Sequence, residues 1–327
     1  MYKLKHIGRT FFAFTIAGFT LISTFLPTFI AESSILKSSM IRSSQVSDML
    51  LCQSAPGQTF SSISLLYANQ DTTFMEISDD FYSTSNGRDF VLGPDEMEWD
   101  RFEFLGEYKG RSYFLFIDDN FKRHLYSTID GVMYNAGPSP TNGDWNQIKF
   151  LVSTENYVYF AFQDDQSFHD QLYVSTDGTK FSEIKPSILG DNINSIRLLQ
   201  EDNGRAYFRV DDDTFSSWLY STIDDSIPVL GPEYETGRWL SLVFMGQNGD
   251  DSYFSLESSD FTQNIYLTSD GAQYTEVSIP EPENSGAFST FSFLGSASGW
   301  AYFEYVDDSF NSYLFSTTDG SSFTQGL

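Results

Sequence analysis

Short segments of alternating apolar and polar residues recur along the chain from residue 60 onward, in the same order six times. Each copy opens with a segment such as residues 145–151 (WNQIKFL), in which apolar residues alternate with polar ones in the pattern Trp-x-x-Ile-x-Phe-Leu. A second segment carries an adjacent aromatic pair, as in Tyr159-Phe160, and a third carries a single aromatic residue such as Tyr173. Alternation with a period of two is typical of strands with one buried face. The pattern therefore predicts at least three strands in each copy.

A tight turn follows the third segment of almost every copy. Residues 175–178 read Ser-Thr-Asp-Gly, and an Asp-Gly or Asn-Gly pair between apolar runs is a strong hairpin signal because both residues tolerate a positive φ. An aromatic residue returns three positions after the glycine, as at Phe181, and begins a fourth strand. The third-strand aromatic residues that fix the period, about 47 residues, are Tyr82, Tyr126, Tyr173, Tyr220, Tyr266 and Phe315.

Six copies of four short strands with no helical periodicity between them predict an all-β fold, a six-bladed β-propeller of four-stranded antiparallel blades. A single blade cannot bury both of its faces, so neighbouring copies have to cover one another. The predicted blades span residues 60–98, 99–144, 145–192, 193–238, 239–287 and 288–327.

The first 59 residues have a different composition from the repeats. Lys3, Lys5 and Arg9 precede an uncharged stretch over 10–31, which is the order of an export signal. We expect residues 1–31 to be a signal peptide cleaved near Ala31, which makes the protein secreted or extracytoplasmic. The stretch is also long enough to span a bilayer, so a retained signal-anchor on the outer side of the membrane is the alternative. Residues 32–59 form a Ser-rich linker, in which the apolar patch 49–52 could add a strand.

The charge of the chain excludes some partners. The net charge is -27, with 18 basic against 45 acidic residues. Such a chain repels phosphate, so we expect no nucleic-acid partner, and contact with a membrane only through the N-terminal segment if it is uncleaved. A protein, a polysaccharide or a cation is the expected partner, and solubility alone would also explain the charge. The single cysteine, Cys52, and the scarcity of histidine argue against a disulfide or a zinc centre.

The tight turns resemble the Asp-box, or bacterial neuraminidase repeat, of propellers such as sialidases and sortilin-like receptors. The resemblance covers residues 60–327 and is carried by segments such as 175–181 (STDGTKF), although here glycine follows the aspartate directly. In Asp-box proteins the motif is a structural hairpin on the face away from the active site. The resemblance therefore implies that the aspartates at these positions hold turns. These structural hairpin residues are Asn86, Asp130, Asp177, Asp224, Asp270 and Asp319.

Acidic turns between the second and third strands are the candidate binding surface. They would project from the end of the blades opposite the boxes, together with the acidic loops that join successive blades. The residues of this acidic face are Asp118, Asp119, Asp164, Asp165, Asp211, Asp212, Asp213, Asp307 and Asp308. Carboxylates at this density are ligands for hard cations, so bound calcium is one reading, but no turn shows the spaced Asp-x-Asp-x-Asp-Gly ladder. Solvated turn carboxylates are the other reading, and no cofactor is predicted.

The sequence favours a binding or scaffold module over an enzyme. The sialidase resemblance would imply three arginines clamping a carboxylate, a tyrosine nucleophile paired with a glutamate, and an acid-base aspartate. We identify no catalytic residues, because the tyrosines of the repeat have core roles and the arginines are scattered. A glycoside hydrolase is the alternative, and a structural role in a cell envelope is a third. Trp99, Trp145 and Trp239 could line a sugar-binding mouth or pack between blades.

Overall fold

The computed structural model describes residues 60–94, 98–185, 193–202, 204–222, 228–233, 238–282 and 285–326. The predicted signal segment 1–31, the linker 32–59 and its apolar patch 49–52 lie outside these residues. Within the described ranges every regular element is a β-strand, and no helix there is long and apolar enough to cross a membrane.

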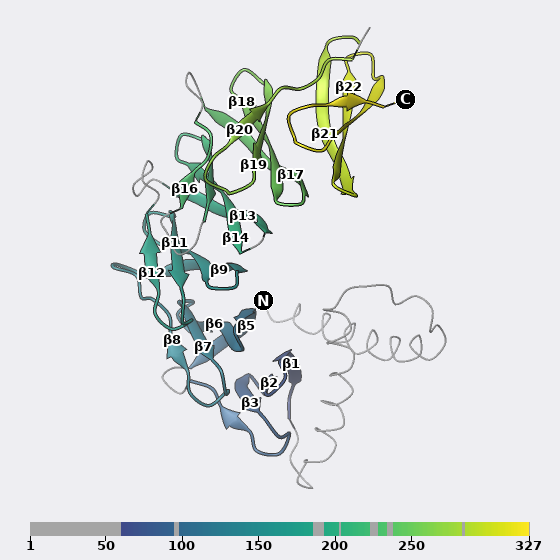
Figure 1. Cartoon of the computed structure of the whole chain (residues 1–327). Helices are drawn as coiled ribbons and strands as arrows, with labels where there is room; N and C mark the ends of the chain where they lie inside the picture. The colour runs from purple at the N-terminus through teal and green to yellow at the C-terminus, as the bar shows by residue number, and fades with distance from the viewer. Residues whose placement is uncertain are drawn as a thin grey trace. The chain divides into compact units, whose positions relative to one another are not determined.

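The strands form six four-stranded antiparallel meanders in chain order (Figure 1). Their bounds are β1 Ile63–Ala68, β2 Thr73–Ile77, β3 Asp80–Thr84 and β4 Val91–Leu92 in blade 1; β5 Trp99–Tyr108, β6 Arg111–Asp118, β7 Arg123–Thr128 and β8 Asn135–Ala136 in blade 2; β9 Trp145–Ser153, β10 Val158–Asp164, β11 Asp170–Ser175 and β12 Ser182–Ile184 in blade 3; β13 Ile193–Asp202, β14 Arg205–Asp212, β15 Ser217–Ser221 and β16 Val229–Leu230 in blade 4; β17 Trp239–Asn248, β18 Asp251–Ser258, β19 Gln263–Thr268 and β20 Thr275–Val277 in blade 5; and β21 Phe288–Ala297, β22 Trp300–Asp307, β23 Ser312–Thr317 and β24 Thr324–Gln325 in blade 6.

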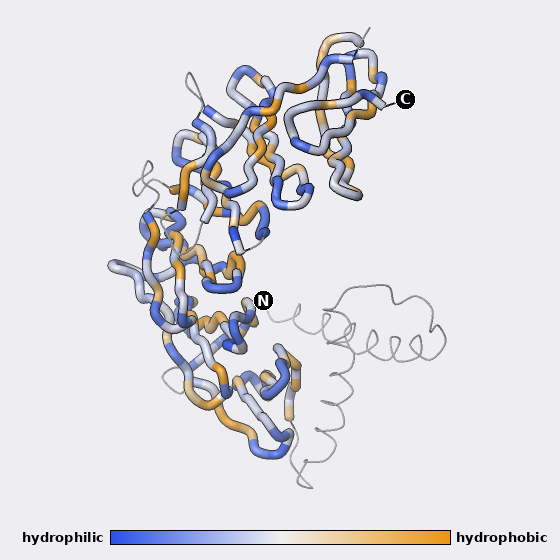
Figure 2. Tube along the Cα trace, viewed as in Figure 1, coloured by the Kyte–Doolittle hydropathy of each residue, from blue (hydrophilic) through white to orange (hydrophobic). Residues whose placement is uncertain are grey.

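The prediction of an all-β propeller built from six four-stranded blades is confirmed by this topology. Each blade pairs its strands in the order first, second, third, fourth, and the sheets of blades 4 and 5 are also joined by one pair, Ser217 with Trp239. Hydrophobic residues follow the strands and hydrophilic residues gather at the turns, as expected for strands buried between neighbours (Figure 2).

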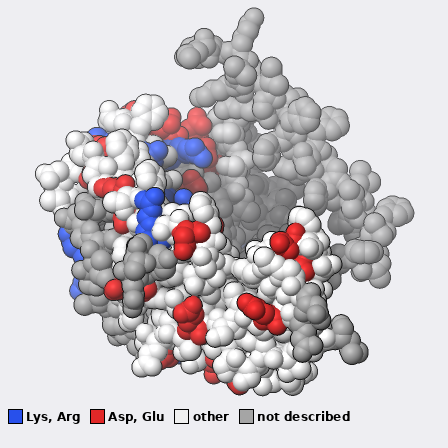
Figure 3. Space-filling view, turned by 90° about the horizontal axis from the view of Figure 1, so that it is seen from above, with Lys and Arg blue, Asp and Glu red and all other residues white. Residues whose placement is uncertain are grey.

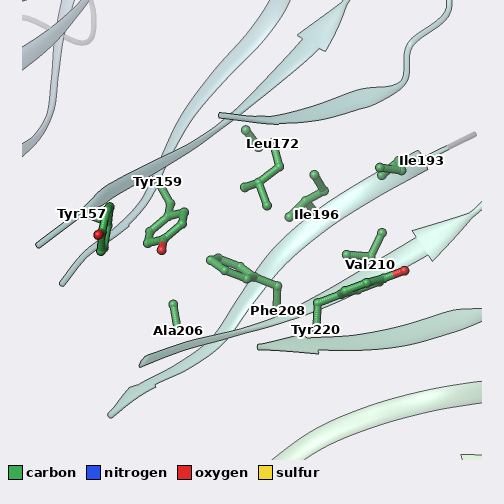
Figure 4. Close-up of a cluster of buried hydrophobic side chains, with 10 residues drawn as sticks. Tyr157, Tyr159, Leu172, Ile193, Ile196, Ala206, Phe208, Val210 and Tyr220 are labelled. Atoms are coloured by element: carbon green, nitrogen blue, oxygen red, sulfur yellow. The ribbon is translucent and has the colours of Figure 1, made fainter. Parts of the chain in front are cut away.

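The Tyr-Phe pair on the second strand of a blade holds successive blades together. Successive residues of a strand point to opposite faces, so the tyrosine faces the following blade and the phenylalanine faces the preceding one. Tyr159 on β10 meets Phe208 on β14 with ring centroids 5.5 Å apart, and both side chains are fully buried (Figure 4). The same contact between consecutive blades joins Tyr113 to Phe160, Tyr207 to Phe254 and Tyr253 to Phe303, at 4.9 to 5.1 Å.

A β-bulge at one repeat position adds a second contact to each interface. The register of β5 with β6 skips Leu105, so that Phe104 and Gly106 pair with consecutive partners. A bulge turns the extra residue out of the strict alternation. Phe104 therefore packs on the core shared with blade 1, and Leu105 packs on the core shared with blade 3. The equivalent skipped residues are Leu66, Leu151, Leu199, Met245 and Leu294.

Each of the five hydrophobic cores lies between two consecutive blades. They join blades 1 and 2, 2 and 3, 3 and 4, 4 and 5, and 5 and 6. The outer faces of the first and last blades keep apolar side chains exposed, including Ile63 and Leu65 in blade 1 and Leu294, at 58%, in blade 6. A closed propeller ring would bury the outer faces of blades 1 and 6 against each other. Closure of the ring stays a prediction.

Candidate functional site

The two ends of the blades carry different kinds of turn. In an antiparallel meander the turn between the third and fourth strands and the turn between the second and third strands lie at opposite ends. We call the first the box end, defined by the turns at Asn86, Asp130, Asp177, Asp270 and Asp319. We call the second the Phe-turn end, defined by the turns at Phe121, Phe168, Phe215, Phe261 and Phe310.

Hydrogen bonds inside each hairpin organise the box end. Asp177 Oδ1 accepts the backbone N–H groups of Thr179 and Lys180, both at 2.8 Å, and Ser175 Oγ accepts the N–H of Gly178 at 2.8 Å. The bonds from Lys180 and Thr179 lower the pKa of Asp177 from 3.8 to about 2, so the carboxylate stays ionised. The same pattern of bonds occurs at Asn86, Asp130, Asp270 and Asp319. Asp224 lies outside the described residues.

In blades 2, 3, 5 and 6 the glycine of the box also lies against the preceding blade. Gly131 has a φ of 72°, and a Cβ at this position would lie 2.7 Å from the side chain of Ser83 in blade 1. Ser83 Oγ donates a hydrogen bond to the Gly131 carbonyl oxygen, and Tyr113 Oη donates one to the carbonyl oxygen of Gly178, at 3.3 Å. Glycine is required here both for the positive φ and for the close approach of the two blades. The box end is therefore explained by the fold.

Every Phe turn places a phenylalanine where hairpins usually have glycine. In blade 6 the N–H of Phe310 donates to the Asp307 carbonyl oxygen at 3.0 Å, and the strand pairing resumes with Asp307 N–H to Asn311 O at 3.1 Å. This is the short hairpin loop whose last residue is left-handed, a position that favours glycine. The five residues at this position are Phe121, Phe168, Phe215, Phe261 and Phe310, with φ of 64°, 59°, 60°, 63° and 63°.

The fold does not explain these phenylalanines. Their side chains are 72%, 58%, 76%, 78% and 85% exposed in chain order, so they contribute almost nothing to a core. A left-handed conformation costs a residue with a Cβ about 1–2 kcal/mol. Exposed side chains held in strained turns are typical of functional sites. Blade 1 differs, because its turn is formed by Ser78 and Asp79 and has no phenylalanine.

The first aspartate of a Phe turn is a structural residue. Asp307 is fully buried, and its Oδ1 accepts the N–H groups of Ser309 and Asn311 at 2.9 and 2.8 Å. Its Oδ2 accepts Nδ2 of Asn311 and the N–H of Gly286. These bonds, led by the one from Asn311, lower the pKa of Asp307 to about 2 despite its burial.

The structure therefore divides the acidic face that the sequence grouped together. Asp118 and Asp212 are buried caps like Asp307, and Asp164 caps its turn in a half-buried position. Asp211 lies on β14 and accepts bonds from Arg209, Ser195 and Ser217. These five carboxylates accept hydrogen bonds from groups of their own blade.

The remaining carboxylates stand beside the exposed phenylalanines. Asp119, Asp213 and Asp308 are exposed, and Asp165 is half-buried. In blade 5, Ser258 replaces the capping aspartate and Asp260 is the exposed carboxylate directly before Phe261. Each Phe turn thus presents one aromatic ring and one accessible carboxylate, one to three residues apart.

The charge around the turns changes along the chain. In blades 2 and 3 basic residues lie in the turns themselves: Lys122 pairs with Asp144 at 3.0 Å, and His169 lies 3.1 Å from Asp213. Residues 239–327, which form blades 5 and 6, contain twelve acidic residues and no Lys, Arg or His. Figure 3 shows both kinds of surface, one part with basic and acidic side chains side by side and another with acidic side chains only.

The tryptophans belong to the core. Trp145 and Trp239 are buried, and their Nε1 groups donate to the carbonyl oxygens of Pro138 and Pro232 at 2.8 and 2.9 Å. Trp99 makes the same bond to Pro94 at 2.8 Å from a half-buried position. They fix the connections between blades, which favours the packing reading over a sugar-binding mouth.

A cavity of about 600 Å³ between blades 2 and 3 bears on the enzyme alternative. It is lined by Arg101, Arg123 and Lys149, but also by Glu103, and no tyrosine is among its lining residues. The sialidase-type constellation needs a tyrosine with its arginines, and this cavity does not provide one; the glycoside hydrolase stays the alternative function. Within the described part of the chain, no group of three or more His, Cys, Asp or Glu side chains is arranged to hold a metal ion.

Sequence reasoning missed the phenylalanines although they were visible. A phenylalanine follows an acidic turn residue by one to three positions in all six copies, but in the first copy it is Phe81, which is buried in β3. The acidic residues of these turns were predicted as a binding surface, but phenylalanine is not a typical turn residue. Its left-handed φ and its exposure are visible only in the structure.

Comparisons with known proteins give fold-level similarity only. No family model matches the chain, and no curated protein matches it, so the resemblance to Asp-box repeats stays a prediction. Among solved structures, the chain is similar to a GH74 xyloglucanase from Xanthomonas campestris (14% identity, TM-score 0.31, 82% of this chain and 50% of that chain), so it spans half the length of that enzyme. It is also similar to the Aleuria aurantia lectin, solved with α-methyl-L-fucoside (8% identity, TM-score 0.27, 81% and 94%), and to a lectin from Burkholderia pseudomallei (9% identity, TM-score 0.35, 81% and 82%). At these identities and TM-scores the similarities carry no argument about the ligand.

Proposed function

We propose that this chain is a multivalent binding module of the extracytoplasmic space that engages a polysaccharide through its Phe-turn end. The observation that carries the proposal is the set of five exposed, left-handed phenylalanines at equivalent turns. Neither burial nor backbone preference accounts for them, so we assign them to a ligand.

The chemistry of a Phe turn suits a sugar. An aromatic ring packs against the apolar C–H face of a pyranose, and a carboxylate accepts hydrogen bonds from hydroxyl groups. Asp308 and Phe310 illustrate this pair, because both side chains are exposed and they lie two residues apart.

Repetition of the pair favours a polymer. Five turns offer the same weak contact, and a ligand with repeating units can engage several of them at once, which raises its overall affinity far above that of one contact. A folded protein partner would instead need a continuous interface of about 800 Å². The export-type leader predicted from residues 1–31 is not needed for this binding, but secretion would bring the module to cell-surface or environmental polysaccharides.

Binding of the full-length chain to a panel of immobilised polysaccharides tests the proposal. We expect retention on at least one polysaccharide, and loss of retention when all five phenylalanines are replaced by alanine. Ile129→Ala with Met133→Ala is the matched control, because both residues are exposed and apolar but lie at the box end. Retention that survives the five substitutions, or no retention on any polysaccharide, would refute the proposal.

A further inference from the structure

The ligand of the Phe turns can be specified further from their charge. We infer that the polysaccharide carries free amino groups, so that each bound sugar places its pyranose face on a phenylalanine and its ammonium group beside the neighbouring aspartate. This inference rests on the proposed function and adds the chemical class of the sugar.

Both groups of a Phe turn attract a cation. The carboxylate provides a charge-assisted hydrogen-bond acceptor, and the face of the aromatic ring carries the negative part of its quadrupole. An amino sugar satisfies both groups together with the apolar contact, whereas a neutral sugar leaves the carboxylate's charge without a partner. Asp308 is exposed, and the side-chain bond it accepts comes from the hydroxyl of Ser309 at 3.4 Å.

The distribution of basic residues supports a cationic ligand. Residues 239–327, the third of the repeat region that forms blades 5 and 6, contain twelve acidic residues and no Lys, Arg or His. The two phenylalanines of these blades, Phe261 and Phe310, are also the most exposed of the five, at 78% and 85%. The two turns with the most exposed phenylalanines therefore also lie in the blades that contain no basic residues.

The turns of blades 2 and 3 provide an internal contrast. His169 lies 3.1 Å from Asp213 of the next turn, and Lys122 lies beside Phe121 and pairs with Asp144. A basic side chain of the protein itself already lies there. We therefore place the strongest amino-sugar contacts at the Asp260–Phe261 and Asp308–Phe310 turns.

Three hexasaccharides that share their linkage and differ only at C2 test the inference: β-1,4-linked glucosamine, N-acetylglucosamine and glucose. Calorimetric titration of each into the full-length chain at low ionic strength should show the glucosamine hexamer binding at least about tenfold tighter than the other two, as one additional charge-assisted contact predicts. The preference should fall as salt is added, because accessible charges are screened.

Two pairs of substitutions separate the carboxylates from general charge effects. Asp260→Asn with Asp308→Asn should abolish the preference for glucosamine. Glu276→Gln with Glu304→Gln removes the same charge from strands β20 and β22 of the same blades and should leave the preference intact. Phe261→Ala with Phe310→Ala should weaken all hexamers that bind.

The outcomes are distinguishable. Equal binding of the three hexamers, unaffected by the Asp260 and Asp308 substitutions, would overturn the inference and leave the proposed function standing. If no hexamer binds and the polysaccharide panel is also negative, while a lysine-rich peptide binds through the same phenylalanines, both the inference and the proposed function are overturned in favour of a basic protein partner.

Discussion

The two ends of the blades both contain tight hairpins with a left-handed residue, but the residue at that position differs. Both ends have tight hairpins that an aspartate caps and that contain one residue with a φ near 65°. At the box end that residue is glycine, packed against the preceding blade, as Gly131 is against Ser83. At the Phe-turn end it is a phenylalanine such as Phe310, which points into solvent. The box end follows the preferences of the backbone, whereas the Phe-turn end departs from them without any gain in packing.

This difference separates residues that the fold requires from residues that a ligand requires. A glycine at a left-handed position with no room for a Cβ needs no functional explanation. A bulky exposed residue that recurs at the same φ in five blades, while the residues around it differ, does need a functional explanation. The contrast between the two ends should hold in each of blades 2 to 6, and four experiments test it.

The largest expected effect on stability tests whether the six blades close into a ring. Met245 packs between blades 5 and 6, and Leu294 is its equivalent on the outer face of blade 6. Met245→Asp should lower the free energy of unfolding by about 4 kcal/mol, because it buries an unpaired charge. If the ring closes, Leu294→Asp should lower it by a similar amount in urea denaturation. A change below about 0.5 kcal/mol for Leu294→Asp would mean that this face is exposed to solvent and the ring is open.

Adding a methyl group at the box end should be nearly as costly. Gly131→Ala combines an unfavourable φ with overlap onto buried Ser83, and we expect it to lower the free energy of unfolding by about 3 kcal/mol. Denaturant unfolding measures this change. Wild-type stability of Gly131→Ala would show that the box glycines are not required by the fold, which would remove one side of the comparison.

Acid should weaken both ends in the same pH window. The pKa values of Asp177 and Asp307 are lowered to about 2 in the folded chain, from 3.8. Ionised carboxylates therefore stabilise the fold above about pH 4, and this contribution is lost as the pH falls through about 2. Thermal unfolding between pH 5 and pH 2 should show a falling midpoint, with a shallower fall in Asp177→Asn and in Asp307→Asn. An unchanged slope in either variant would contradict the capping role of that residue.

The smallest effect has the opposite sign to the box substitution. Phe215→Gly removes the strain of the left-handed phenylalanine but adds freedom to the unfolded chain, so we expect the free energy of unfolding to rise by about 0.5 kcal/mol. Chemical denaturation of this variant beside Gly131→Ala gives the direct contrast between the ends. A loss of more than about 1 kcal/mol would show that the phenylalanine stabilises the fold after all.

The sequence predicted most of the fold because its signals were local. Alternation identified the strands, and Asp-Gly pairs such as Asp177-Gly178 identified the hairpins. The β-bulge at Leu105 was not predicted, because a skipped residue is a property of the pairing between two strands. The candidate site was predicted only in part: the acidic turns were found, but local sequence could not tell the buried cap Asp307 from the exposed Asp308, since this depends on where the chain passes beside Gly286.

Replacing all five turn phenylalanines by glycine, and measuring stability and polysaccharide binding on the same preparation, tests the central claim most directly. The account predicts a chain at least as stable as the wild type that no longer binds the polysaccharide retained by the wild type. A chain that loses stability, or one that binds as well as before, would contradict the claim that these residues serve a ligand.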